Sequence, residues 1–244
     1  MRSLNHIDFE IAACQATLFT PDEEFSSVKI IQNFYPGWGD LFDADPIILP
    51  PFPSGIPGDV ARIVLQSTSE TWRCEIAPAR INFLWRRTAQ AISSIELGTF
   101  FAKAFDVLIG YQQLLGSRIG RLATVITRFA LHDTPALFLA RHFCQDRWSK
   151  APLNRPENFE LHAHKQFLLD TTFQVNSWAR SKTGHLTKED SQIPIVMFEQ
   201  DLNTILEEAP TKSFSAADLQ HFLHAAASEL DVILRLYYPQ EREK

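Results

Sequence analysis

Segments with strand character follow one another directly in this chain, and this order constrains the fold more than any other feature. A hairpin is predicted from 61–66 and 71–76, because both runs have strand-like composition and flank a Ser/Thr-rich turn. A further strand is predicted over 80–86, and a long hairpin over 159–178. Strands joined by short connections pair antiparallel, so the sequence predicts a largely antiparallel sheet.

Further strands are expected at 6–13, 119–129 and 193–198. In the first of these, apolar side chains alternate with acidic ones, which is typical of a half-buried strand. The segment 180–185 is predicted to be a loop, because Gly184 lies in a polar context.

Three main helices are expected to pack on this sheet. The first opens at the capping pattern Thr20–Glu23 and runs to about Phe34. The second runs from Ser94 to about Leu115, where Gly116 supplies a left-handed cap. The third main helix is the final one of the chain. A further, shorter helix is expected over residues 134–143.

The final helix has the strongest signals. A capping box begins at Ser215 and ends at Asp218, flanked by a staple of Phe214 and Leu219. The helix ends before Pro239. One face carries an apolar stripe, formed by Leu219, Phe222, Leu223, Ala226, Leu230, Ile233 and Leu234.

Together these elements predict an α+β fold: a largely antiparallel sheet with about three main helices packed on it. The expected organisation is a single domain, 1–244, with two strand-helix-strand halves at about 1–117 and 118–244. The hydrophobic content of 45% is enough for a sizeable core. The proline-rich segment 46–58 is expected to be a surface crossover, the alternative being an extended arm that lies across a partner.

Charge is segregated along the chain. Residues 1–60 carry 2 basic and 9 acidic side chains, for −7. Residues 61–188 carry 17 basic and 9 acidic, for +8, and residues 189–244 carry 4 basic and 11 acidic, for −7. Either the acidic ends fold against the basic middle, or the middle presents a basic face to an anionic partner.

The basic middle supplies the candidate binding residues. Arginines bind phosphates through paired hydrogen bonds, and aromatic rings stack on unpaired bases. A sheet face with both could hold single-stranded nucleic acid. The candidates for binding nucleic acid or another anion are Arg80, Arg86, Arg87, Arg121, Arg128 and Trp85.

Histidine pairs offer a weaker alternative. His162 and His164 lie two apart on a predicted strand, and His221 and His224 lie three apart on the final helix. Two such pairs could form a four-nitrogen metal site, but no carboxylate or cysteine spacing supports it, and ordinary surface or interface histidines are favoured. Since no nucleophile motif or phosphate-binding loop is present, the sequence favours a non-catalytic protein without a cofactor.

Several protein classes are disfavoured. No window approaches the roughly 20 apolar residues that span a bilayer, and no secretory leader is recognised. Cys14, Cys74 and Cys144 are odd in number and widely spaced, which favours three small core residues rather than disulfides. A soluble, cytoplasmic protein with no membrane partner is therefore expected.

Three stretches carry a resemblance to a known family. They are the strand from Trp72 to Phe83, the strand from Ile119 to Phe129, and the segment Phe198–Asn203 before the closing amphipathic helix. In the order of its elements the chain resembles a sporadically distributed, uncharacterised bacterial protein family of about this length. The resemblance implies a prokaryotic source and a helix-decorated antiparallel sheet, and it supplies no catalytic residues.

These observations predict a non-catalytic interaction, adaptor or sensor subunit of a prokaryotic complex, with another protein subunit as its partner. The sporadic distribution of the resembling family suggests anti-phage defence as the setting. The alternative is a component that binds nucleic acid through a basic sheet face with interleaved aromatic residues.

Overall fold

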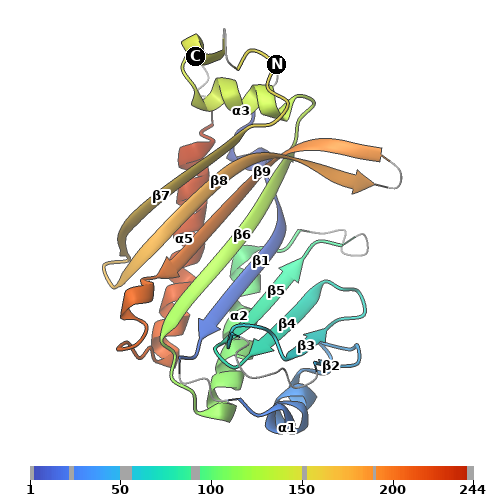
Figure 1. Cartoon of the computed structure of the whole chain (residues 1–244), viewed down its shortest axis with the longest axis vertical. Helices are drawn as coiled ribbons and strands as arrows, with labels where there is room; N and C mark the ends of the chain where they lie inside the picture. The colour runs from blue at the N-terminus through green and yellow to red at the C-terminus, as the bar shows by residue number, and fades with distance from the viewer. Residues whose placement is uncertain are drawn as a thin grey trace.

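The computed structural model describes residues 3–21, 25–49, 57–88, 94–149, 153–188 and 191–240. Its strands form a nine-stranded sheet in the order β2-β3-β4-β5-β1-β6-β9-β8-β7 (Figure 1). Every neighbouring pair is antiparallel. The predicted α+β class and antiparallel sheet are therefore confirmed.

The strands are β1 (Glu10–Phe19), β2 (Ile47–Ile48), β3 (Ile63–Gln66), β4 (Trp72–Ala77), β5 (Arg80–Arg86), β6 (Arg121–Leu131), β7 (Glu160–Leu169), β8 (Phe173–Lys188) and β9 (Ser191–Thr204). The helices within the described residues are α1 (Ser27–Lys29), α2 (Leu97–Leu115), α3 (Pro135–Phe143), α4 (Asp146–Ser149) and α5 (Ala216–Tyr237). Short 3-10 or π-helical turns are η1 (His6–Asp8), η2 (Ile30–Phe34), η3 (Tyr35–Trp38) and η4 (Leu206–Glu208). The expected number of three main helices is not confirmed, since in the described part of the chain only α2, with 19 residues, and α5, with 22, are long.

Apart from the two-residue edge strand β2, the strand order is symmetric about the central pair β1–β6. In residues 1–117, β1 is followed by the meander β3-β4-β5 and then by α2. In residues 118–244, β6 is followed by the meander β7-β8-β9 and then by α5. The two halves therefore share one order of elements and contribute to one continuous sheet (Figure 1).

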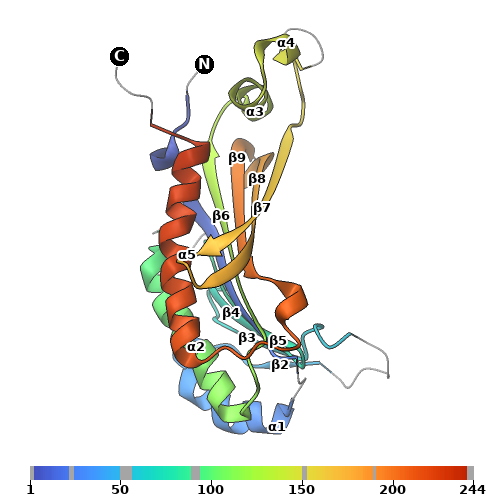
Figure 2. The ribbon, with the colours of Figure 1, turned by 90° about the vertical axis from the view of Figure 1, so that its left-hand side faces the viewer.

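Both long helices cover the same face of the sheet (Figure 2). Helix α2 packs on β1 and β5, α5 packs on β6 and β7, and the two helices contact each other. The alternation of side chains along β6 explains why the helices pack on this face, because Leu122 and Ile126 point to the helices and are fully buried. A single apolar cluster runs through both halves and includes Phe83 and Phe100, whose rings stack at 5.7 Å. Among the described residues, no helix is long and apolar enough to cross a membrane.

Two predicted end signals of the long helices are confirmed, and one is wrong. Ser215 and Asp218 form the predicted capping box at the start of α5. Gly116 ends α2 with φ +73°, a backbone conformation that glycine adopts without steric cost. The predicted Ser94 cap is wrong, because the N-cap of α2 is Glu96, which makes no side-chain capping bond.

The first predicted helix begins later than expected. Thr20 Oγ1 donates a hydrogen bond to the carbonyl of Pro78, so this hydroxyl is not used for capping. The helix starts at α1 instead, where the Ser26 side chain accepts from the amide of Lys29. Residues 22–24 lie outside the described residues, as do residues 50–56 of the predicted proline-rich crossover.

Strand β8 is longer than predicted, and the expected loop at 180–185 is wrong. These residues continue β8 and pair with β9. Gly184 allows close packing against β9 and does not form a turn, because an added Cβ would lie 2.7 Å from the Sδ atom of Met197. Beyond the ends of β6 and β7, the β8–β9 hairpin projects from the sheet as a two-stranded ribbon (Figure 1).

Candidate functional site

The face of the sheet opposite α2 and α5 carries the candidate site, and we call it the open face. Directly paired residues of neighbouring strands point to the same side, so the register identifies its members. The tryptophan row consists of His164, Trp178, Asp201, Val125, Gln15, Leu84 and Arg73. The asparagine row beside it consists of Gln166, Asn176, Asn203, Ala123, Thr17, Asn82 and Glu75.

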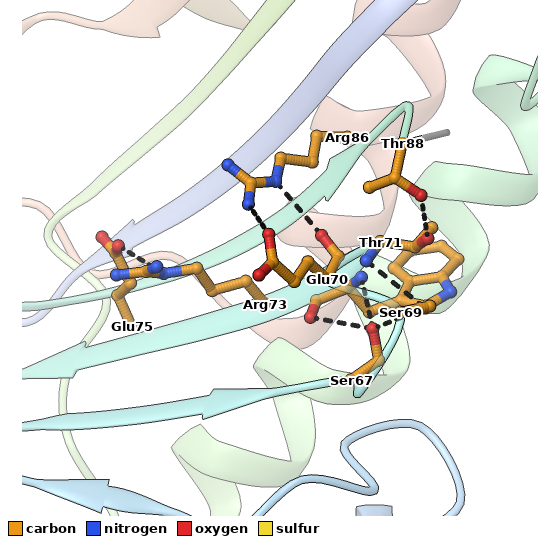
Figure 3. Close-up of polar contacts among 9 residues, drawn as sticks. Ser67, Ser69, Glu70, Thr71, Arg73, Glu75, Arg86 and Thr88 are labelled. Carbon is orange, nitrogen blue, oxygen red and sulfur yellow. Dashed lines mark hydrogen bonds and ion pairs between the residues drawn. The ribbon is translucent and has the colours of Figure 1, made fainter. Parts of the chain in front are cut away.

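In the first half of the chain, several polar side chains of the open face contact one another. Thr17 Oγ1 donates to Asn82 Oδ1 at 2.9 Å, and Asn82 Nδ2 donates to Glu75 Oε2 at 3.3 Å. The other oxygen of Glu75 lies 2.8 Å from Arg73 Nε (Figure 3). These side chains are held in place before any partner binds.

In the second half, Asn203 is the centre of a larger network. Its Oδ1 accepts from Arg121 Nη2 at 2.6 Å and from Asn176 Nδ2 at 3.3 Å. Its Nδ2 donates to Asp201 Oδ1 at 2.8 Å. Asn176 Oδ1 in turn accepts from Gln166 Nε2, which extends the network to the edge strand β7. Four strands are thus connected through side chains as well as through the backbone.

Trp178 is the largest aromatic side chain in the two rows, and it is held between His164 and Arg180. The His164 ring stacks on it at 4.3 Å, and the guanidinium of Arg180 lies 5.3 Å from the indole. Arg180 Nη1 also contacts Glu199 Oε1 at 2.5 Å. A half-buried indole fixed in this way presents a rigid apolar surface bordered by charge.

Four of the predicted arginines lie at two separate places. Arg80 and Arg121 pair with Phe19 from opposite sides, and the Arg121 guanidinium lies 4.7 Å from the Phe19 ring. Arg86 and Arg87 lie at the far end of β5. Burial lowers the pKa of Arg121, while Asp201 and Glu207 act to raise it. The predicted cations therefore do not gather into one patch.

Two predicted binding residues, Arg128 and Trp85, point to the helix-covered side of the sheet, so the prediction that they belong to an exposed basic sheet face is wrong. Each is only 3% exposed, because the alternation of β6 and β5 directs them toward the helices. Arg128 Nη2 pairs with Asp231 of α5 at 2.9 Å, and Arg128 Nη1 donates to Gln200 Oε1. Neither can contribute to an exposed sheet face.

Acidic terminal segments neutralise part of the basic middle. Glu10, Glu199 and Asp231 come from the acidic ends, and they pair with Arg87, Arg180 and Arg128 respectively. Within the middle segment, Arg86 pairs with Glu70 at 2.5 Å (Figure 3). Charge that is segregated along the sequence is compensated in space.

The histidine pairs do not meet. His164 is on the open face, whereas His221 belongs to α5 and its Nε2 lies 2.6 Å from Asp170 Oδ2. His162 lies on β7, as His164 does, and His224 lies on α5, as His221 does. Within the part of the chain that the structure describes, no three metal-ligating side chains come together. The four-nitrogen arrangement is therefore absent there.

The cysteines are free thiols. Burial raises the pKa of Cys14 to about 12 and also raises the pKa of Cys74. A thiolate nucleophile is strongly disfavoured at both positions. Cys144 is only partly buried, so the prediction of three core residues is confirmed for two of them.

No protein-family model matches this chain, and no match was found among curated proteins. Sequence reasoning missed Trp178 and Arg180, considered His164 only as a metal ligand, and missed Asn176 and Asn203 as the network centre. Polar residues at every second position of β9, namely Glu199, Asp201 and Asn203, were the available signal.

Proposed function

We propose that this protein is a non-catalytic interaction subunit, an adaptor or sensor, whose open face binds a partner protein. The observation that carries the proposal is the pair of rows crossing seven neighbouring strands, whose polar side chains hydrogen-bond to one another. Side chains that are already ordered lose little conformational entropy when a partner binds.

The pairing of charges favours a protein partner over a phosphate backbone. Arg73, Arg86 and Arg180 each contact a carboxylate on or beside the open face. Binding phosphates would require these pairs to separate, whereas a protein interface accommodates paired charges at its polar rim. The formal net charge of −6 also opposes nonspecific binding of nucleic acid.

The composition of the tryptophan row suits an interface. Trp178 of this row and Arg180, two residues further along β8, belong to the residue types that contribute most to binding energy at protein interfaces. At the centre of the sheet the side chains are small, with Ala123 and Val125 on β6. A partner can therefore approach the backbone of the central strands while contacting Trp178 at one side.

One observation supports the alternative function, which is binding of single-stranded nucleic acid. Arg80, Phe19 and Arg121 form a row across β5, β1 and β6, in which an aromatic ring is flanked by two cations. Such a row can stack a base and contact its phosphates. Affinity that falls steeply with salt would identify this function.

The test is site-specific photo-crosslinking in the native host. A photoreactive residue replaces Val125 at the centre of the open face, and a matched control replaces Leu236, which is 69% exposed on α5. We expect a covalent adduct with one protein from position 125 and none from position 236. The partner is then purified and its affinity is measured by calorimetry.

The affinity measurement decides the proposal. Trp178→Ala should weaken binding of the purified partner by roughly tenfold or more, because a central aromatic side chain is removed. Leu236→Ser should leave the affinity unchanged. Equal crosslinking at both positions, or wild-type affinity of Trp178→Ala, would show that the partner binds elsewhere.

A further inference from the structure

A cavity of about 540 Å³ lies on the side of the sheet that the helices cover, away from the open face. It is bounded by η1 and β1, by the first turn of α2 and by the second half of α5. Its volume is within the range of sites that bind small molecules. We call it the α2–α5 cleft.

The buried guanidinium of Arg128 lines this cleft. Its side chain is 4% exposed, and its two terminal nitrogens contact Gln200 and Asp231. Gln200 is itself fixed, because its Nε2 donates to the carbonyl of Leu230 at 2.6 Å. Arg128 is therefore held in one orientation by residues of β9 and α5.

The charges around Arg128 are buried to different extents. The side chain of Asp231 is 55% exposed, so solvent screens much of its negative charge, while the positive charge of Arg128 lies in a low-dielectric environment. Arg235 and Glu96 are exposed residues of the lining, and His6 lies beside them. Of the charges that line the cleft, two basic and two acidic, that of Arg128 is the least screened by solvent.

The start of α2 adds to this polarity. Gly98, in the first turn of this 19-residue helix, lines the cleft, and the N-cap Glu96 makes no side-chain capping bond. The first amides of a helix lack intrahelical acceptors and favour a negative charge nearby. Apolar lining comes from Phe9, Leu97 and Leu234.

We propose that the α2–α5 cleft binds a small organic anion, a carboxylate attached to an apolar body. The carboxylate contacts Arg128 and the first turn of α2, and the apolar body packs against Phe9, Leu97 and Leu234. A buried arginine is costly unless its charge is used, and burial lowers the pKa of Arg128 despite its contact with Asp231. A bound carboxylate offsets that cost. This proposal does not depend on the function of the open face.

The test compares two probes that differ in charge, hexanoate and hexan-1-ol, by calorimetry on the full chain. Hexanoate should bind at one site, roughly tenfold or more tighter than hexan-1-ol, since only the anion pairs with Arg128. The absence of hexanoate binding at concentrations up to about 10 mM would overturn the proposal. Equal affinities for the two probes would overturn it as well.

Three variants localise the binding. Gly98→Leu fills the cleft, and nothing lies within 4 Å of its Cβ position, so folding is retained while hexanoate binding is lost. Thr99→Leu is the matched control, because this neighbouring residue is exposed and does not line the cleft. Arg235→Gln should weaken binding about threefold through loss of an exposed cation.

Arg128→Met removes the central cation and should abolish the preference for hexanoate over hexan-1-ol. If this variant does not fold, Gly98→Leu and Arg235→Gln still decide the result, with folding followed by circular dichroism. Hexanoate affinity that is unchanged in Gly98→Leu would contradict the assignment of the cleft.

Discussion

The two halves of the molecule have the same order of elements but very different strand lengths. The meander of the first half has strands of 4, 6 and 7 residues, whereas that of the second half has strands of 10, 16 and 14. The central strands are nearly equal, at 10 and 11 residues. The second half therefore supplies most of the open face and all of the projecting ribbon.

The surface chemistry of the halves differs in the same direction. Each half has an arginine–glutamate pair on the open face, Arg73 with Glu75 and Arg180 with Glu199. Only Arg180 also lies over a tryptophan of the tryptophan row, Trp178. On the same open face, the first half therefore carries a polar surface, and the second half carries an aromatic surface bordered by charged side chains.

Stability should be the property in which the halves differ least. Phe100 of α2 and Phe222 of α5 are both essentially buried in the common core. Each change to alanine should lower the free energy of unfolding by about 3–5 kcal/mol, through lost burial and the cavity left behind. Denaturant titration followed by circular dichroism should show one transition in both variants. Two transitions, with only one affected by each change, would mean that the halves 1–117 and 118–244 unfold separately.

The two halves should differ clearly in how much they contribute to the affinity for the partner protein. Trp178 and Leu84 belong to the same row but lie in different halves. For the purified partner, Trp178→Ala should cost about 2 kcal/mol of binding free energy and Leu84→Ala less than about 0.5 kcal/mol. Calorimetric titration measures both. A larger loss for Leu84→Ala would place the centre of the interface in the first half.

The two halves also differ in how their long helices are capped, with a smaller expected effect on the free energy of unfolding. Ser215 caps α5 through its side chain, whereas Glu96 at the start of α2 makes no such bond. Ser215→Ala should lower the free energy of unfolding by about 1 kcal/mol, and Glu96→Ser should raise it by about 0.5 kcal/mol. Thermal unfolding of both variants checks these signs. A stabilising Ser215→Ala would contradict the capping geometry.

The same cap predicts a pH dependence. Hydrogen bonds from the Ser215 side chain and backbone lower the pKa of Asp218 below its ordinary value of 3.8. A carboxyl with a lowered folded-state pKa stabilises the fold above its unfolded-state pKa and loses that effect as the pH falls through the folded-state value. The destabilisation by Asp218→Asn should therefore be full at neutral pH and fade below about pH 4. Denaturant titrations at a series of pH values measure it, and a constant difference would contradict the assignment.

Local signals allowed most of the fold to be predicted. The residues of β5 and the capping box of α5 follow from short-range patterns, and both are confirmed. Gly184 was misleading, because a glycine required by a close contact with Met197 has the same sequence signature as a glycine in a turn. Thr20 was misleading for a similar reason, since its hydroxyl bonds to a distant carbonyl.

The candidate site was harder to predict than the fold. Arg128 and Trp85 lie on strands that were predicted correctly, but single-strand patterns do not tell which face the helices cover. The contact of Trp178 with His164 and that of Asn176 with Asn203 depend on the register of β7, β8 and β9. Register is set by pairing between strands, so these networks become visible only in the folded sheet.

The central claim is that carboxylates within the fold neutralise Arg73, Arg86, Arg87 and Arg180, which lie on or beside the open face. Titration of a fluorescent single-stranded oligonucleotide at about 50 mM salt tests it directly. The wild-type protein should show no saturable binding. A variant with Glu10→Gln, Glu75→Gln and Glu199→Gln, which frees Arg87, Arg73 and Arg180, should gain binding that weakens steeply with salt. Steeply salt-dependent binding by the wild-type protein would contradict the claim and favour nucleic acid as the partner.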